Sequence, residues 1–244
     1  MPAGSAQDDE APLVVHVVHR FDYGGLENGL VNIINTMDDS AYRHAIIALT
    51  EATDFAQRIR RKNTAVYSLG KRPGKDLRAY LRLWSLLHRL KPAVLHTRNM
   101  GTLDCALVGR LAGIRVCVHG EHGWDTHDPD GTVRKYRILR KFMGLFVARF
   151  ITVSEHLARW LINSVGIPAG KVTAICNGVD TDKFCPAATP ARSLLPAQFR
   201  GDRTVVIGTV SRFEAIKDPL NLVRAFISAH AVCEKNGVSL RLAM

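Results

Sequence analysis

Residues 13–37, LVVHVVHRFDYGGLENGLVNIINTM, decide the fold class of this chain. Residues 13–19 form an apolar run rich in valine, which favours a buried strand. The paired glycines Gly24 and Gly25 follow, and from 27 to 37 apolar residues recur at the spacing of a helix. A buried strand, a glycine turn and a helix in this order indicate a parallel sheet covered by helices.

The same alternation continues along the chain, in units of roughly 25 to 30 residues that suit strand–helix–strand crossovers. We therefore predict an α/β protein with a parallel sheet. Further strands are expected at 43–49, 64–69, 93–97, 115–119, 150–153 and 172–176, and further helices at 55–62, 76–90, 103–111, 133–147 and 155–163.

A proline-rich stretch without periodicity separates two parts of the chain. A new cycle follows it, with a strand at 204–210, a helix at 219–233 and a strand at 238–243. One such unit cannot cover both faces of its sheet, so we expect an interrupted two-domain protein. The expected divisions are a flexible tail at 1–12, a first domain at 13–185, a linker at 186–202 and the incomplete beginning of a second domain at 203–244.

The composition limits the partners and the compartment. The chain has 244 residues, and 33 Lys and Arg against 22 Asp and Glu give a formal charge of +11. Such a surface attracts phosphates, nucleic acid or an anionic membrane. Five cysteines without Cys-x-x-Cys spacing favour reduced thiols in a cytoplasmic protein. Neither a secretion signal nor an apolar run of about 18 residues is present in the sequence, so any membrane contact would be peripheral.

The expected helix at 133–147 interleaves basic residues with aromatic and aliphatic ones. A basic amphipathic helix of this kind can rest on anionic headgroups at the inner face of the cytoplasmic membrane. The alternative is a helix that faces the core and has a solvated basic side. The sequence leaves both interpretations open.

Polar motifs follow several expected strands, at the edge where parallel sheets bind ligands. After the first strand, Gly24 and Gly25 precede Glu27 at a helix N-terminus, which suits an anion or, alternatively, a plain tight turn. The dinucleotide fingerprint Gly-x-Gly-x-x-Gly is not matched. After the fourth strand come Arg98 and Asn99, where an arginine fork suits phosphate or carboxylate, or is simply solvated.

The densest polar cluster is HGEHGWD at 119–125, after the fifth strand. His119, Glu121 and His122 within it suit recognition of substrate hydroxyls by a neutral imidazole. A metal site and a buried structural His119 are the alternatives. Later in the chain, Arg212 and Lys217 bracket a loop before a helix, an arrangement that can hold a diphosphate or form a solvated loop.

Taken in order, these motifs resemble the family 4 retaining glycosyltransferases of the GT-B fold, which have two Rossmann-like domains. The segments 27–32, 71–76, 96–99 and 120–123 resemble, more finely, the sugar transferases that accompany exosortase-linked exopolysaccharide systems. The matching segments are Gly24-Gly25-x-Glu27, Glu121-His122-Gly123, Ser154, Asn177-Gly178-Val179-Asp180 with Phe184, and Gly208 with Arg212 and Lys217.

The resemblance implies transfer of a sugar from a nucleotide-sugar to a glycan or lipid-linked acceptor, with no metal or cofactor. It implies that His122 is catalytic and contacts the donor sugar. Gly24, Gly25, Arg212 and Lys217 would bind the donor diphosphate. The implied acceptor and substrate residues are Glu27, Arg98, Asn99, His119, Glu121 and Asn177.

The family's paired glutamates are expected beyond Met244, so this chain is expected to bind an acceptor without efficient turnover. A non-catalytic acceptor-binding remnant is one alternative. A nucleic-acid-binding protein is another, but the aromatic residues fall mostly on helical apolar faces rather than on a basic stripe, so nucleic acid is not an expected partner. A nucleotide-binding oxidoreductase is disfavoured by the missing dinucleotide glycines.

Overall fold

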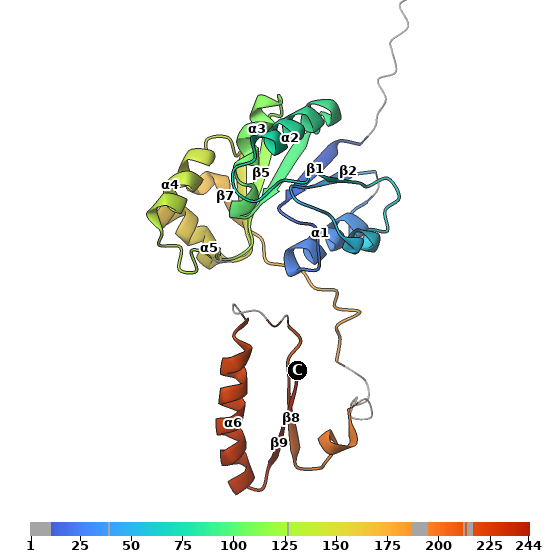
Figure 1. Ribbon diagram of the computed structural model, residues 1–244, viewed down its shortest axis with the longest axis vertical. Helices are drawn as coiled ribbons and strands as arrows, with labels where there is room; N and C mark the ends of the chain where they lie inside the picture. The colour runs from blue at the N-terminus through green and yellow to red at the C-terminus, as the bar shows by residue number, and fades with distance from the viewer. Residues whose placement is uncertain (1–10, 39, 126, 187–194, 212, 214–216) are drawn as a thin grey trace, which may run out of the picture. The chain divides into compact units, whose positions relative to one another are not determined.

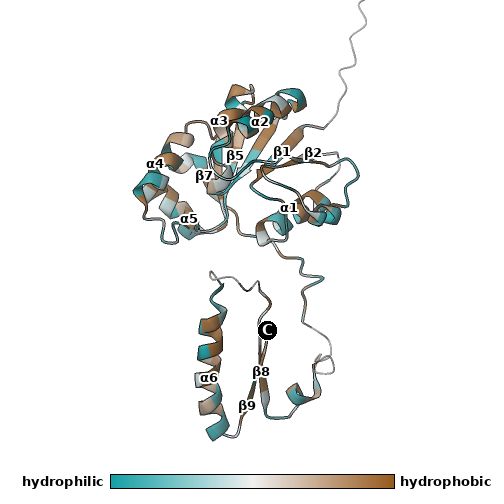
Figure 2. Ribbon diagram, in the orientation of Figure 1, coloured by the Kyte–Doolittle hydropathy of each residue, from teal (hydrophilic) through white to brown (hydrophobic). Residues whose placement is uncertain are grey.

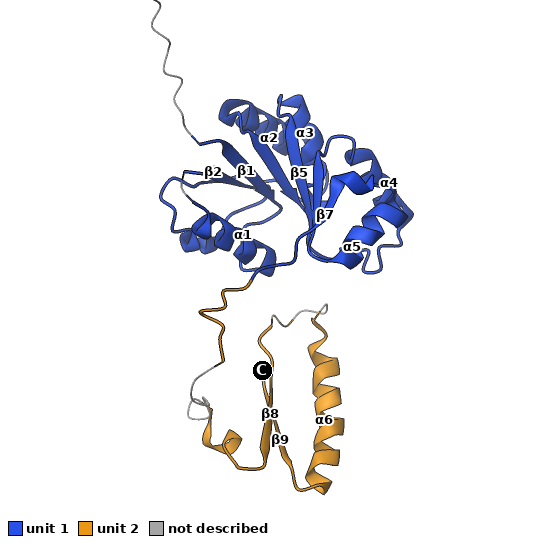
Figure 3. Cartoon of the chain, turned by 180° about the vertical axis from the view of Figure 1, so that it is seen from behind, with its two compact units in different colours: residues 1–178 blue, residues 179–244 orange. Residues whose placement is uncertain are grey.

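The computed structural model describes residues 11–244 except 39, 126, 187–194, 212 and 214–216. The chain divides into two compact units, the first ending at Gly178 and the second running from Val179 to Met244 (Figure 3).

The first unit is built on a seven-stranded, fully parallel sheet, which confirms the predicted α/β fold. The strand order is β3-β2-β1-β4-β5-β6-β7, so the direction of strand addition reverses between β1 and β4. At such a switch point the loops that follow the two strands diverge and leave space for a ligand. The strands are β1 (Leu13–Val18), β2 (Arg43–Ala48), β3 (Ala65–Ser68), β4 (Val94–Arg98), β5 (Val116–Glu121), β6 (Arg149–Thr152) and β7 (Val172–Ala174).

Helices connect the strands and cover the sheet (Figure 1). The longer ones are α1 (Gly25–Thr36), α2 (Leu77–Leu90), α3 (Cys105–Leu111), α4 (Arg134–Met143) and α5 (Glu155–Trp160). Shorter helical turns are η1 (Asp54–Arg58), η2 (Met100–Thr102), η3 (Leu161–Val165) and η4 (Ala169–Lys171), of which η3 is a π-helix that continues α5.

Two apolar clusters pack the two faces of this sheet. On one face, Leu30 and Ile34 of α1 pack against Val18 and Ile46 of the strands. On the other face, α2, α3, α5 and η3 contribute to a larger cluster that includes Val15 and Val17 of β1. Alternate residues of β1 therefore serve opposite faces, as its apolar run predicts. Strand β1 is correspondingly hydrophobic in Figure 2, whereas α4 mixes hydrophilic and hydrophobic residues.

The second unit pairs β8 (Thr204–Gly208) with β9 (Ser239–Ala243) in parallel, and α6 (Pro219–Lys235) connects them. Asp218 caps α6, because its side chain accepts a hydrogen bond from the Asn221 backbone N–H at 3.2 Å. A short turn, η6 (Ala197–Phe199), precedes β8. Residues 187–194 of the expected linker lie outside the described residues.

Candidate functional site

The turn between β1 and α1 ends at Gly24, and Gly25 begins α1. The Glu27 carboxylate folds back over this turn, and a Cβ at Gly24 would collide with it. Gly24 is the N-cap of α1 and contributes no capping side chain. A Cβ at Gly25 would meet nothing within 4 Å. The first turn of α1 therefore presents backbone N–H groups at the carboxyl edge of the sheet, where anions are favoured.

Arg98 ends β4 beside this turn. Its backbone is held on both sides by Thr102, whose hydroxyl accepts from the Arg98 N–H at 2.6 Å and donates to its carbonyl at 2.7 Å. The guanidinium reaches toward α1, where Nη1 donates to the Leu26 carbonyl at 3.5 Å. Burial lowers the pKa of Arg98 to about 10, against the opposing effect of the Glu27 carboxylate. Arg98 thus remains a buried cation at the switch point at neutral pH.

Asn99 connects the ends of β4 and β5. Its backbone lies in the left-handed region, with φ of 55°. The Asn99 N–H donates to the Gly120 carbonyl at 2.8 Å, and its side-chain oxygen accepts from the His122 N–H at 2.8 Å. Asn99 therefore positions His122 rather than projecting freely into solvent.

His122 is half-buried and neutral. Burial, followed by the Arg98 charge and then His119, lowers the pKa of His122 to about 4, although Glu121 acts in the opposite direction. A neutral imidazole offers one donor and one acceptor. Its Nε2 is buried beside Gly120 and has no hydrogen-bond partner among the described residues. This is the group that the motif predicted as catalytic, held next to Arg98.

His119 and Glu121, predicted to bind substrate, lie inside the protein with 0 and 1 % of their surfaces exposed. The Arg140 guanidinium of α4 donates to Glu121 from Nε at 2.6 Å and from Nη2 at 3.4 Å. His119 lies 2.8 Å from the Thr97 hydroxyl and 3.6 Å from the Glu121 carboxylate. This buried network anchors the carboxyl end of β5 to α4, and so supports the loop that carries His122.

A row of three histidines adjoins the site and was not anticipated as a unit. His16 Nε2 lies 3.0 Å from His44 Nδ1, and His16 Nδ1 lies 3.1 Å from His96 Nδ1. Burial, above all, lowers the pKa of each of these histidines. In the sequence, the row is marked by one histidine inside each of three apolar strands: His16 in β1, His44 in β2 and His96 in β4. These strands are neighbours in the sheet.

The remaining predicted residues lie elsewhere. Asn177 follows β7 and is exposed. Lys217 is exposed directly before the N-cap of α6, in the second unit. Arg212 lies outside the described residues. Within the first unit, the structure therefore gathers Gly24, Gly25, Glu27, Arg98, Asn99 and His122 at the switch point.

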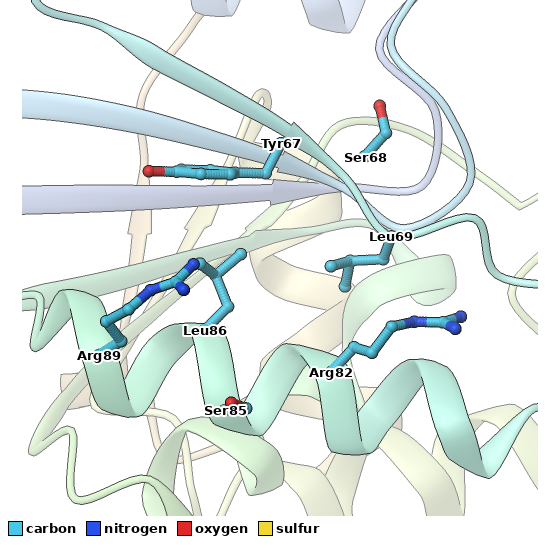
Figure 4. A pocket seen from close by; sticks show the side chains of 7 residues that line it. All are labelled: Tyr67, Ser68, Leu69, Arg82, Ser85, Leu86 and Arg89. Atoms are coloured by element: carbon cyan, nitrogen blue, oxygen red, sulfur yellow. The ribbon is translucent and has the colours of Figure 1, made fainter.

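A small cavity of about 300 Å³ lies between β3 and α2 (Figure 4). Figure 4 shows Arg82 and Arg89 extending from α2, and Tyr67 and Leu69 from the β3 side. The residues predicted from the motifs are not among those that line it. We therefore do not include this cavity in the candidate site.

Three further observations concern metal binding, the cysteines and membrane-spanning helices. In the described part of the chain, no group of three or more His, Cys, Asp or Glu residues is arranged to hold a metal ion. The five cysteines are free thiols. None of the described helices combines the length and the apolar character that spanning a bilayer requires.

The strand order and the convergence of a helix N-terminus, a buried arginine and a neutral histidine define a doubly wound α/β protein with its site at the topological switch point. The chain belongs to Glycosyltransferase Family 4, whose family model matches residues 23–183. The family that the motifs resemble is thereby confirmed.

Two curated relatives are glycosyltransferases by name. The chain is 30% identical over 119 residues to the Escherichia coli UDP-Gal:alpha-D-GlcNAc-diphosphoundecaprenol alpha-1,3-galactosyltransferase, which covers 46% of this chain and 30% of that protein. It is 23% identical over 250 residues to the glycosyltransferase named EpsF of Bacillus subtilis (strain 168), which covers 95% of this chain and 61% of that protein. The chain thus spans less than two thirds of the length of either relative.

Solved structures agree on the fold. Anabaena Alr3699/HepE in complex with UDP and glucose matches with a TM-score of 0.67 at 18% identity, over 94% of this chain and 60% of that one. The UDP-N-acetylglucosamine 2-epimerase from Rickettsia bellii matches with a TM-score of 0.52 at 15% identity, over 96% and 62%. At these identities the likeness establishes the shared fold and no particular reaction.

Proposed function

We propose that this chain serves in the transfer of a sugar from a nucleotide-sugar to a glycan or lipid-linked acceptor in exopolysaccharide biosynthesis. The observation that carries the proposal is the convergence of Glu27, Arg98 and His122 at the switch point of a family 4 domain. The Escherichia coli relative is named for a lipid diphosphate acceptor, and HepE was solved with UDP and glucose. Both names support this substrate class.

In this proposal the domain at 13–185 binds the acceptor, 186–202 is a linker and 203–244 begins the domain that binds the nucleotide-sugar. The α1 N-terminus and Arg98 suit an anionic group, and the neutral His122 suits the hydroxyls of the reacting sugar. Lys217, together with Arg212, would neutralise the leaving nucleoside diphosphate. Positive charge placed where the phosphate oxygens gain negative charge lowers the barrier to transfer.

We further propose that the reaction retains the configuration at the anomeric carbon. The acceptor oxygen would form its bond to that carbon on the face from which the diphosphate oxygen departs, and the acceptor proton would leave with the diphosphate. The finer resemblance to exosortase-linked transferases stays a prediction.

A transfer assay tests the proposed function. The purified chain would be incubated with a panel of radiolabelled nucleotide-sugars and a bacterial lipid extract, and label in the lipid fraction would be measured together with direct binding of each donor and of the lipid acceptor. Transfer of one sugar, or saturable binding of an acceptor, supports the proposal. Absence of transfer and of binding to donors and acceptors contradicts it, and a steep salt-dependent affinity for generic DNA would favour a nucleic-acid-binding protein instead.

Helix α4 supports peripheral contact with an anionic membrane, at the inner face of the cytoplasmic membrane. The helix and the turn after it expose Ile138, Phe142 and Leu145 by 56, 52 and 72 %. Lys135 and Lys141 on the same helix are also exposed. Basic and apolar side chains on one exposed surface favour anionic headgroups.

Vesicle sedimentation tests the membrane contact. The chain should pellet with vesicles that contain anionic lipid and remain in solution with neutral ones, and the Phe142→Ser, Leu145→Ser double variant should pellet less. Both sites are more than half exposed, so the variant keeps its core. Equal sedimentation with neutral and anionic vesicles would exclude this mode of binding.

A further inference from the structure

A second polar cavity lies at the amino edge of the sheet, opposite the site described above. Its volume is about 550 Å³, within the range of small-molecule sites. It is formed by the start of β2, the loop that leads into β3 and the last turn of α1. Among the residues that line it are Arg43, His44, Arg60, Arg61, Lys62 and Thr64.

The lining is strongly basic, with four cationic side chains in one cavity. Backbone carbonyls anchor two of them: Arg43 Nε donates to the Ala11 carbonyl at 2.9 Å, and Arg61 Nη2 donates to the Asp38 carbonyl at 3.0 Å. The Asp38 carboxylate nearby accepts from the Ser40 backbone N–H at 2.8 Å and from its hydroxyl at 2.7 Å. Asp38 keeps its carboxylate charge near Arg61, and the four cations of the lining outnumber it.

The loop that carries these cations is tied to α1. Asn35 on α1 donates to the Arg58 carbonyl at 3.0 Å and accepts from the Arg60 N–H at 2.9 Å. This pair of bonds fixes the backbone from 58 to 60 against the helix. A ligand would thus meet a shaped cavity rather than a set of separate surface side chains.

Two residues that line the cavity carry buried polar atoms, and these favour a ligand that accepts hydrogen bonds. His44 is only 3 % exposed, and its Nε2 has no hydrogen-bond partner among the described residues. The Thr64 hydroxyl is buried and equally without a partner there. A buried polar atom left without a hydrogen-bond partner destabilises the folded chain. Both groups can donate a hydrogen bond to an anion.

We propose that this amino-edge cavity binds a phosphate group, with His44 Nε2–H and the Thr64 hydroxyl as donors and the surrounding cations as counter-charges. A free phosphate compound and the headgroup of an anionic phospholipid share this chemistry. The site is separate from the switch point and does not depend on the proposed function.

Binding at His44 has a consequence for the histidine row. Each of the two hydrogen bonds, His44 to His16 and His16 to His96, needs one N–H and one lone pair. The rings are neutral because burial lowers the pKa of each. One proton per ring then allows only two arrangements of the whole row.

In the first arrangement His44 donates to His16, and His16 donates to His96. His44 Nε2 is then a bare lone pair in the cavity, and His96 carries its proton on Nε2. In the second arrangement all donors reverse: His96 Nδ1–H donates to His16, His16 Nε2–H donates to His44 Nδ1, and His44 Nε2–H faces the cavity. An unprotonated phosphate oxygen accepts hydrogen bonds only, so binding through such an oxygen selects the second arrangement.

His96, at the other end of the row, lies near the switch point, and its Nε2 changes protonation between the two arrangements. His96 Nε2 lies 3.4 Å from the position that a Cβ would occupy at Gly120, and His122 Nε2 lies 2.6 Å from the same position. Phosphate in the amino-edge cavity therefore converts His96 Nε2, beside His122, from a donor into an acceptor. The cavity is in this way linked to the carboxyl edge without movement of the backbone.

Phosphate titration of the intact chain with ¹⁵N-labelled histidine tests both the phosphate site and its coupling to His96. Inorganic phosphate should bind saturably, and the nitrogen resonances of His44 and His96 should change to those of the second arrangement together with binding. Chloride at the same ionic strength serves as the salt control. If phosphate binds without a change at His96, the coupling is refuted; if it does not bind saturably and vesicles do not use the cavity either, the site is refuted.

A charge-matched pair of double variants locates the site. Arg60→Gln with Lys62→Gln removes two cations from exposed positions in the cavity and should weaken phosphate binding by about fivefold or more. Arg224→Gln with Lys235→Gln removes two exposed cations from α6, in the second unit, and should leave it unchanged. Equal weakening by both pairs would mean non-specific attraction and would overturn the assignment.

Vesicles distinguish the two sources of the phosphate group. If the ligand is a headgroup, the cavity variant should lose binding to anionic phospholipid vesicles that the α6 variant retains. If the ligand is a free phosphate compound, both variants should bind vesicles equally while only the cavity variant loses inorganic phosphate. Loss of neither phosphate nor vesicle binding in the cavity variant would contradict the proposal.

Discussion

At Gly120 the main chain passes beside two imidazoles, those of His96 and His122. Alanine at this position would place its Cβ 2.6 Å from His122 Nε2 and 3.4 Å from His96 Nε2. Such a contact requires the His122 ring to move. The end of the ring is the flexible partner here, so the backbone can stay in place.

We therefore predict that Gly120→Ala lowers ligand binding or sugar transfer at the carboxyl edge by at least about tenfold while the chain stays folded, because misplaced catalytic groups lose rate steeply. Isothermal titration and transfer assays beside a thermal unfolding curve would measure both effects. Unchanged binding and transfer in a folded variant would mean that the position of His122 does not matter.

A second prediction at the residue scale concerns the contribution of Glu121 to the free energy of unfolding. Glu121→Gln leaves the Arg140 guanidinium, only 3 % exposed, without its carboxylate, and should cost about 3–5 kcal/mol of unfolding free energy. Glu51→Gln is the control, because Glu51 pairs with Arg20 at 2.8 Å where both side chains are more than half exposed. That exposed pair should contribute less than about 1 kcal/mol. Urea unfolding that shows equal losses would refute the distinction.

At the scale of elements, α1 offers a test of helix propensity near the site. A Cβ at Gly29, in the middle of α1, would meet nothing within 4 Å. Gly29→Ala should stabilise the protein by about 0.5–1 kcal/mol, since glycine loses more backbone freedom than alanine. Gly109→Ala in α3 is the contrasting variant. Its new Cβ would collide with Leu95, so this substitution should destabilise the protein. Stabilisation by both, or by neither, in urea unfolding would contradict this account.

Most elements were predictable because buried parallel strands are apolar and helices are periodic. The predicted strand at 13–19 matches β1, and the predicted helix at 76–90 matches α2. Ends were less predictable: β5 continues to Glu121, because the polar HGE segment is buried by Arg140 and Thr97. Sequence periodicity does not predict that Glu121, at the end of a strand, pairs with Arg140 on a helix farther along the chain.

The site residues in the loops after the strands could be predicted from the sequence. The buried histidines within the strands could not. The motifs indicated the region of Gly24, Arg98 and His122, because all parallel strands end at one edge. The histidine row was missed, because strand neighbours such as β1 and β4 are 80 residues apart in sequence. Only the strand order brings His16 beside His96.

On the scale of the whole molecule, buried neutral histidines make stability depend on pH. Burial lowers the pKa of His16 and His96 well below the ordinary value. Below pH of about 6.5 the unfolded chain therefore binds protons that the folded chain does not, and stability falls as the pH falls.

Two such groups should cost roughly 2–3 kcal/mol per pH unit below that pH. Urea unfolding at pH 7.5 and pH 5.5 measures the loss, and the His16→Gln variant should show a shallower slope even if it is less stable overall. Stability that is constant or that rises on acidification would mean that these histidines are charged in the folded protein.

We predict that this family 4 chain binds a sugar-bearing ligand at the switch point between β1 and β4. The most direct measurement adds a short-chain polyprenyl diphosphate N-acetylglucosamine to the ¹⁵N-labelled chain and follows the glycine amide signals. We predict saturable shifts at Gly24, Gly25 and Gly120, weakened by His122→Ala and kept by the exposed-site variant His127→Ala. Saturable shifts confined to Gly113, which follows α3 at the opposite edge, or no binding at all would contradict the claim.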